Sequence, residues 1–173
     1  MSETLVTIIA IFLAAVLMFV FPLMAVSERN DDIAQLGVQT TTNEFVDNVK
    51  KTGVLTEERY SRYLQSLGAT GNSFEVDMEI KILDENFSSK VGQASSSKIG
   101  ENVYYSIYTS QIEEEIKNDG KLLLKEGDMI TVNVRNTNVT ISQMLKNFFY
   151  RISGNDSYQI AAGASGMITS NGK

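Results

Sequence analysis

Residues 5–26 read LVTIIAIFLAAVLMFVFPLMAV and decide the architecture of the chain. These 22 residues contain no charged side chain, and Thr7 is their only polar one. At about 1.5 Å of rise per residue, a helix of this length extends about 33 Å, which is enough to cross a hydrocarbon core of about 30 Å. We therefore predict that residues 1–26 form a transmembrane helix that anchors the chain.

Two other interpretations of this segment are open. One is a buried core helix, although a helix this long that is apolar on every face is unusual in a soluble domain. The other is a cleaved secretory signal, because Ala25-Val26-Ser27 resembles a small-residue cleavage site. However, residues 1–4 carry no Lys or Arg, and the apolar run is longer than the usual signal core of about 7–15 residues. A retained anchor is therefore favoured.

The anchor contains residue types that allow helices to pack closely. The small side chains of Ala10, Ala14 and Ala15 permit close approach of another membrane helix. Pro22 lacks the amide that would bond the Met18 carbonyl, so we expect a bend near the end of the span. The residues expected to anchor the chain or to pack against other helices are Leu5, Ala10, Ala14, Ala15 and Pro22.

The composition excludes several classes of function. The 173 residues include no Cys, His or Trp, which excludes a disulfide scaffold, a Cys/His zinc site and a Ser–His–Asp triad. Fifteen Lys and Arg against 21 Asp and Glu give a net charge of −6, which argues against binding nucleic acid. The acidic runs at 75–79 and 113–115 are expected to face solvent. We identify no catalytic residue, metal site, cofactor or small-molecule substrate, and predict that the protein is not an enzyme.

After the span, the chain predicts a continued helix. A polar collar at residues 27–32 leads into an amphipathic stretch that can carry the helix to about Lys51, although Gly37 and residues 40–42 are poor helix formers where a break is allowed. Thr52-Gly53 supplies a C-cap. The residues at helical spacing are Ile33, Leu36, Phe45, Val46 and Val49. The predicted organisation is an anchor at 1–26, a helical stalk at 27–53 and an α+β domain at 54–173.

Helical and alternating patterns succeed each other along the domain. The expected helices run from the N-cap Thr56 to Gly68, from a capping box at Ser110 to Gly120, and from about Ile141 to Arg151. The expected strands are 74–82, 103–108, 130–134 and a Gly/Ala-rich strand at 158–169 suited to close approach of another backbone. The loop 84–102 is long enough to contact a partner, and the tail from Ser170 is expected to fray. The predicted fold class is α+β, with a long N-terminal transmembrane helix and three or four mostly antiparallel strands packed on two or three helices.

A set of motifs runs over nearly the whole chain. They are Pro22, the polar collar up to Val38-Gln39-Thr40, Phe45-Val46-Asp47-Asn48-Val49, Thr52-Gly53, Tyr60 to Leu67, Ala69-Thr70-Gly71-Asn72, Tyr108-Thr109, Ile112, Gly127-Asp128, an aromatic helix and a glycine-containing last strand. On these motifs the chain resembles single-span proteins encoded with Tad-type pilus or secretion genes in Gram-positive bacteria, which are related to TadE-like minor pilins. Ordinary prepilins carry a basic leader before the apolar helix, whereas here the helix begins almost at Met1.

The resemblance implies a pilin-like fold without catalytic residues. It also implies that Glu3 acts as the assembly acid that neutralises a neighbouring N-terminus, although an acid at a helix start has the plainer meaning of favouring the helix dipole. The leading hypothesis is a membrane-anchored pilin-like subunit, a minor pilin or pseudopilin, of a Tad-type pilus or secretion apparatus. Its partners would be the lipid bilayer and other pilus or secretion-machinery subunits, and its domain would be extracellular.

Two further hypotheses stay open. A bitopic scaffold or regulatory component of an envelope assembly machine would use the same anchor without entering a filament. A secreted domain released after Ser27 would lose the anchor. The charges beside the span weakly favour a cytoplasmic domain, because Arg29 follows the span and only Glu3 precedes it. Long domains cross membranes largely regardless of such charges.

Overall fold

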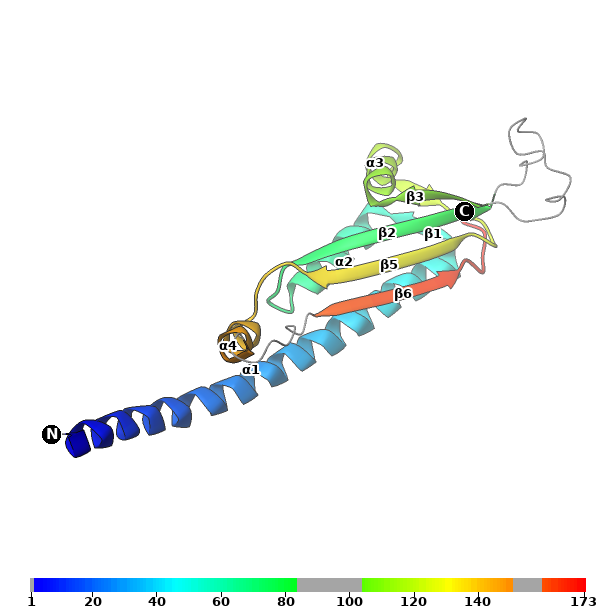
Figure 1. Cartoon of the computed structure of the whole chain (residues 1–173). Coiled ribbons are helices and arrows are strands. Elements are labelled where there is room, and N and C mark those ends of the chain that lie inside the picture. Colours follow the sequence, from blue (N-terminus) through cyan, green and yellow to red (C-terminus); the bar gives the residue numbers. More distant parts are fainter. Residues whose placement is uncertain (1, 84–103, 151–159) are drawn as a thin grey trace, which may run out of the picture.

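A single long helix dominates the computed structural model, which describes residues 2–83, 104–150 and 160–173. Helix α1, Ser2–Thr52, is 51 residues long and is continuous. Its first half projects away from the rest of the chain, and its second half lies along the domain (Figure 1). Gly37 and residues 40–42 lie inside the helix, so the break that their propensities allow does not occur. Packing of the second half against the domain outweighs those weak preferences.

The end of α1 has the predicted C-cap. Gly53 has a φ of +64°, and its amide donates to the Val49 carbonyl at 2.8 Å. A Cβ at Gly53 would collide with the backbone of residues 170–172, because the chain's end packs against this turn. The amide of Gly172 also donates to the Leu124 carbonyl at 2.9 Å. The expectation that the tail frays is therefore wrong, since its backbone covers the end of α1.

The strands confirm the α+β class. Within the described residues, one antiparallel sheet has the order β3-β2-β5-β6, and a second sheet pairs β1 with β4. The small sheet was not predicted, because β1 and β4 have only three residues each and show no alternation that a sequence pattern can reveal. The strands are β1 Val54–Thr56, β2 Phe74–Leu83, β3 Tyr104–Tyr108, β4 Lys121–Leu123, β5 Met129–Asn136 and β6 Ala161–Met167.

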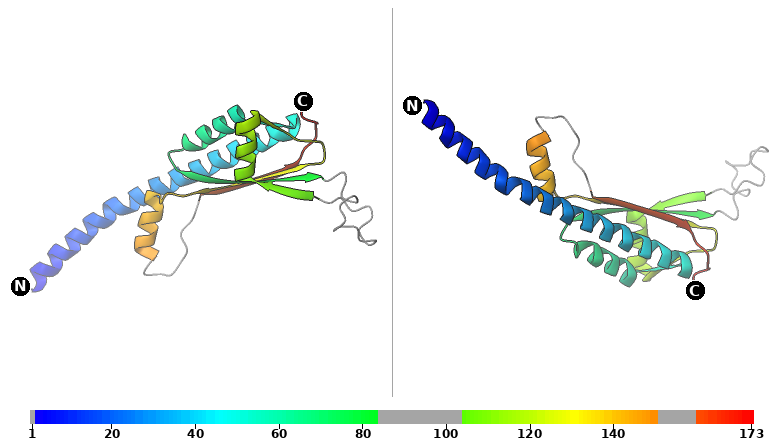
Figure 2. Two further views of the ribbon diagram at one scale, coloured as in Figure 1. Left: turned by 90° about the horizontal axis from the view of Figure 1, so that it is seen from above. Right: turned by 90° about the horizontal axis from the view of Figure 1, so that it is seen from below.

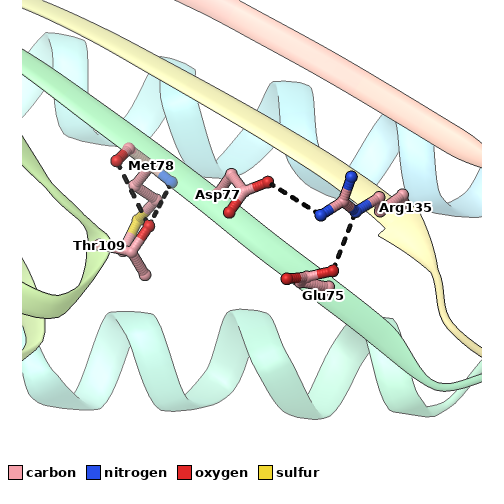
Figure 3. Close-up of polar contacts among 5 residues, drawn as sticks. All are labelled: Glu75, Asp77, Met78, Thr109 and Arg135. Atoms are coloured by element: carbon pink, nitrogen blue, oxygen red, sulfur yellow. Dashed lines mark hydrogen bonds and ion pairs between the residues drawn. The ribbon is translucent and has the colours of Figure 1, made fainter.

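The shorter helices of the described chain lie close to the predicted ranges. They are α2 Glu57–Gly68, α3 Thr109–Asp119 and α4 Ile141–Tyr150. Thr56 caps α2 as predicted, because its Oγ1 accepts from the Arg59 amide at 3.3 Å. The cap of α3 differs from the prediction, since the N-cap is Tyr108 and not Ser110. Thr109 instead bonds through Oγ1 to the amide of Met78 on β2, at 2.7 Å, and so extends the contact of β3 with β2 (Figure 3).

The core lies between the second half of α1 and one face of the four-stranded sheet. Residues 27–52 are helical, and this segment belongs to the core, because Val38 and Val49 are fully buried. Two residues expected on the apolar face of this segment, Ile33 and Leu36, are instead 61% and 68% exposed. The sequence pattern misplaced this face because buried polar residues share it. The buried residues of this stripe are Ser27, Asp31, Ala34, Val38, Thr42, Phe45, Val46 and Val49.

Strand β6 lies directly beside α1 (Figures 1 and 2). Its small residues make this approach feasible, because the Lys50 side chain passes over Gly166 where any Cβ would collide with it. Gln35 binds the outer edge of β6, donating to the Ala161 carbonyl at 2.5 Å and accepting from the Ala161 amide at 2.9 Å. Gln39 donates to the Gly163 carbonyl at 3.2 Å. The predicted close approach of the Gly/Ala-rich strand to another backbone is confirmed, and α1 is its partner.

Candidate membrane anchor and its junction with the domain

The first half of α1 presents an apolar surface on all sides. It is the one helix of the described residues long and apolar enough to cross a membrane, and no residue of its most apolar 18-residue window is buried. Large side chains such as Phe12, Met18 and Phe19 are 70–75% exposed. A helix in the core of a soluble domain would bury these side chains. The exposed apolar cylinder fits a single-pass membrane protein.

The residues predicted to pack against other helices lie on this cylinder but not on one face. Ala10 and Ala14 are four residues apart and therefore share a face of α1. Ala15 and Pro22 are seven residues apart and share another face, turned away from the first. Leu5 is 58% exposed in the second turn. The helix continues through Pro22 to Thr52. The three alanines of the anchor thus lie on two faces of α1 and do not form one continuous stripe.

Glu3 occupies the first turn of α1, and its side chain is exposed. Its carbonyl oxygen accepts from the Thr7 hydroxyl at 2.8 Å. A carboxylate in the first turn interacts favourably with the positive end of the helix dipole. This position is compatible both with the assembly role that the resemblance implies and with an ordinary helix-start acid.

A polar junction follows the last residue of the apolar run and ties α4 to α1. Asp31 is 8% exposed, and its carboxylate accepts from the Thr140 hydroxyl at 2.8 Å. One turn earlier on α1, the Glu28 carboxylate lies 3.1 Å from the Lys146 ammonium of α4. A buried carboxylate must be hydrogen-bonded to be tolerated, and Thr140 supplies such a bond. These contacts fix the start of α4 beside the exit of the span.

A cavity of about 330 Å³ opens at this junction, and its lining is mainly polar. Ser27 and Asp31 of α1 face Asn72, Asn138 and residues 139–142 across it. The Ser142 hydroxyl is buried and has no hydrogen-bond partner among the described residues. Nowhere in the described ranges do three or more Asp or Glu gather in a group that could hold a metal ion. The junction is therefore a polar contact between α1 and the start of α4, and its described residues do not form a catalytic arrangement.

The open face of the large sheet carries the acidic run of β2. The Arg135 Nε donates to Glu75 at 2.9 Å, and its Nη2 lies 3.9 Å from Asp77 (Figure 3). This guanidinium holds the pKa of the Glu75 carboxyl below its usual range, through the hydrogen bond first and the charge second. Glu79 accepts from the Ser106 hydroxyl at 2.7 Å. These side chains lie on the open face as predicted. Arg135 compensates the charge of Glu75 and Asp77 across the strands, and Ser106 supplies Glu79 with a cross-strand hydrogen bond.

The second acidic run, residues 113–115, begins near α2. The Tyr60 hydroxyl donates to the Glu113 carboxylate at 2.6 Å. The pKa of the Tyr60 phenol is raised, mainly by burial and secondly by this hydrogen bond. The contact joins α2 to α3 and therefore has a structural role. The loop 84–102, expected to contact a partner, lies outside the described residues.

Two features of the junction were missed by the sequence analysis. The buried Asp31 was grouped with the polar collar, because a single carboxylate in a polar run gives no signal of burial. The start of α4 carried a readable signal, since Thr140-x-x-Gln143 is a capping box. The Gln143 amide donates to Thr140 Oγ1 at 3.2 Å, and Gln143 Oε1 accepts from the Thr140 amide at 3.1 Å.

Comparison of the chain with protein-family models, with known proteins and with solved structures finds no match. Function is therefore inferred from the chain's own geometry and from the motifs described above.

Proposed function

We propose that the protein is a membrane-anchored, pilin-like structural subunit, a minor pilin or pseudopilin of a Tad-type pilus or secretion apparatus, with its domain outside the cytoplasm. One observation carries the proposal. A single helix is exposed and apolar over its first half and packed on an antiparallel sheet over its second half. Such a subunit can be held in a bilayer, or among the helices of other subunits, while the sheet domain faces water.

A second observation supports contacts between subunits. Ile33 and Leu36 are exposed apolar residues on α1 beyond the span, on the side turned away from the sheet. They extend the apolar surface of the first half into the domain region. In a helical assembly, a neighbouring α1 would cover them, because apolar side chains of this size gain free energy when removed from water.

The proposal is tested by shearing the surface of cells that produce the full chain. We expect the protein in the sheared filament fraction, and we expect protease added to intact cells to reach residues 27–173. The Leu36→Asp variant should fold normally, because this side chain is 68% exposed, and should be lost from the sheared fraction. A matched control is Leu64→Asp, at an exposed leucine of α2, which should leave the sheared fraction unchanged.

Other outcomes would point elsewhere. A chain that stays with the membrane after shearing, with its domain accessible from outside, would be the bitopic scaffold. A mature N-terminus located after Ser27 would identify a secreted domain released from a signal. A domain that protease cannot reach in intact cells would contradict an extracellular subunit of either kind.

A further inference from the structure

Among the side chains of helix α4 that the structure describes, residues 141–147, two polar ones are buried and two large apolar ones are exposed. Ser142 and Gln143 are buried, at 1% and 7% exposure. Ile141 and Met144 are 55% and 54% exposed, and Val139 just before the helix is 58% exposed. Ile141, Met144 and Leu145 share one side of the helix through their i, i+3 and i+4 spacing. An amphipathic helix in water normally turns this side toward the core, so the exposed side requires another partner.

The position of α4 along α1 indicates that partner. Its two ties reach Glu28 and Asp31, which follow the last apolar residue of the span, Val26. At about 1.5 Å per residue, these positions lie about 3 and 8 Å beyond the end of the span. The headgroup layer of a bilayer adds about 5–8 Å to each side of its hydrocarbon core. The ties therefore hold the start of α4 at the level of the headgroups.

The orientation of α4 also fits a membrane surface. In both views of Figure 2, α4 runs crosswise to α1 and away from it. If α1 crosses the bilayer, a helix crosswise to it lies near the membrane plane. Its exposed residues Ile141 and Met144 then lie at the level where the apolar surface of residues 5–26 ends. This level favours lipid over a protein partner.

We propose that α4 is a membrane-surface helix that inserts Val139, Ile141 and Met144 among the lipid headgroups and outer acyl chains, and so fixes the height of the domain above the bilayer. The inference rests on the proposed anchoring of α1. Amphipathic helices in this position typically bury their apolar face about 5–10 Å into the boundary between headgroups and acyl chains. The bonds of Thr140 to Asp31 and of Lys146 to Glu28 would transmit this contact to α1.

Because the sequence contains no tryptophan, a single introduced tryptophan reports only on its own position. Single-tryptophan variants of the full chain would be reconstituted into phosphatidylcholine–phosphatidylglycerol vesicles containing lipids brominated at shallow or deep acyl positions. Phe19→Trp reports on the span, Met144→Trp and Ile141→Trp report on α4, and Glu114→Trp is an exposed reference on α3. These positions are exposed in the protein, so tryptophan should not disturb folding.

We expect both α4 tryptophans to emit at shorter wavelength than Glu114→Trp and to lose most intensity with the shallow bromolipid. Phe19→Trp should lose most intensity with the deep one, and Glu114→Trp should be unaffected by either. Adding Ile141→Asp to Met144→Trp should shift the emission to longer wavelength and reduce quenching, whereas adding Leu64→Asp should not.

The outcomes separate this inference from the proposed function. If Phe19→Trp is quenched but both α4 tryptophans behave like the Glu114→Trp reference, the inference fails and the anchor stands. If Phe19→Trp itself is not quenched, the anchoring fails. If Met144→Trp emits at short wavelength without quenching by lipid, and its emission depends on the protein-to-lipid ratio, a second copy covers α4 and lipid does not.

Discussion

The two halves of α1 share one continuous backbone but have opposite surroundings. Residues 5–26 expose apolar side chains in all directions, whereas residues 27–52 bury a single stripe and expose the rest. Because a helix satisfies its backbone hydrogen bonds internally, it can pass from lipid to protein without a change of conformation. The comparison shows that side-chain pattern, and not backbone geometry, selects the partner of each half.

The second half differs from the first in a further respect, because it contacts its partner through polar groups as well. Thr42 is fully buried and donates to the Val38 carbonyl at 2.7 Å while its oxygen lies 3.0 Å from the Tyr63 hydroxyl. Gln35 and Gln39 bind the edge of β6. An exposed strand edge can pair with other chains, so its coverage by α1 protects the sheet.

The comparison predicts that replacing an apolar residue by Asp has unequal effects on stability along α1. The largest loss is expected in the second half. Val38→Asp places an unpaired carboxylate at a position with 0% exposure between helix and sheet. We expect the free energy of unfolding to fall by more than about 4 kcal/mol, because a buried charge without a partner is among the most destabilising changes. Urea unfolding of the detergent-solubilised chain, followed by circular dichroism, measures this loss.

Leu36→Asp is the matched control, two residues earlier on an exposed side of the same helix. Its effect on stability should stay within about 0.5 kcal/mol, as for most surface substitutions. Phe12→Asp should leave domain stability equally unchanged, although it should weaken membrane insertion. Equal loss of stability in Val38→Asp and Leu36→Asp would show that the second half of α1 does not pack on the sheet through the stripe described above.

A smaller effect is expected at the polar contact between α1 and β6. Gln35→Ala removes two hydrogen bonds to Ala161, and at about 0.5–1.5 kcal/mol each the unfolding free energy should fall by about 1–3 kcal/mol. The exposed edge should also increase association of the protein. Chemical denaturation and light scattering measure the two effects.

Gln39→Ala serves as the comparison, because Gln39 makes one longer bond to β6, at 3.2 Å. It should cost less than Gln35→Ala and cause less association. A loss for Gln39→Ala as large as that for Gln35→Ala would contradict this account, because the two residues make unequal bonds to β6 and Ala is the better helix former at both positions.

The sequence predicted the parts of this fold that repeat a pattern over many residues. The apolar run 5–26 and the alternation in β2 are such signals, and α1 and β2 are found as predicted. The Gly53 cap was predicted from a strong local signal, a glycine after the last helical residue, and is also found. The face of residues 27–52 was misplaced, because Asp31 and Thr42 lie on the buried stripe and count as polar in any pattern. Their burial depends on partners more than 20 residues away, Thr140 and Tyr63, which no local window contains.

Helix α4 shows more clearly that a local sequence pattern does not reveal distant partners. The apolar pattern of α4 predicts a helix correctly, but it does not tell which surface that side will meet. A pattern typical of a core helix is here combined with polar ties to Glu28 and Asp31, which turn the apolar side outward. Only the tertiary contacts distinguish a core helix from a helix that faces another partner.

The smallest loss predicted at neutral pH concerns Tyr63, which joins α2 to the second half of α1. Burial raises the pKa of its phenol to about 12, against the opposing effect of the hydrogen bond with Thr42. The folded pKa lies above the unfolded value of about 10, so the neutral phenol is the form that the folded state favours. Its contribution to the free energy of unfolding is therefore complete below pH 10. It is lost as the pH rises toward 12, by about 1.4 kcal/mol per pH unit. Tyr63→Phe should cost about 1 kcal/mol at neutral pH, for one hydrogen bond, and should reduce this alkaline loss.

Tyr60 shares the direction of this shift through its burial and its bond to Glu113, so part of the alkaline loss should persist in Tyr63→Phe and disappear only when Tyr60→Phe is added. Denaturation series from pH 8 to 12 measure the slopes. Unfolding of the first half of α1 contributes no titrating group to them, since residues 5–26 contain neither tyrosine nor charge. An alkaline slope unchanged by Tyr63→Phe would mean that this phenol ionises freely in the folded protein, and that α1 and α2 are less closely packed than the 4.2 Å stacking of Phe45 on Tyr63 indicates.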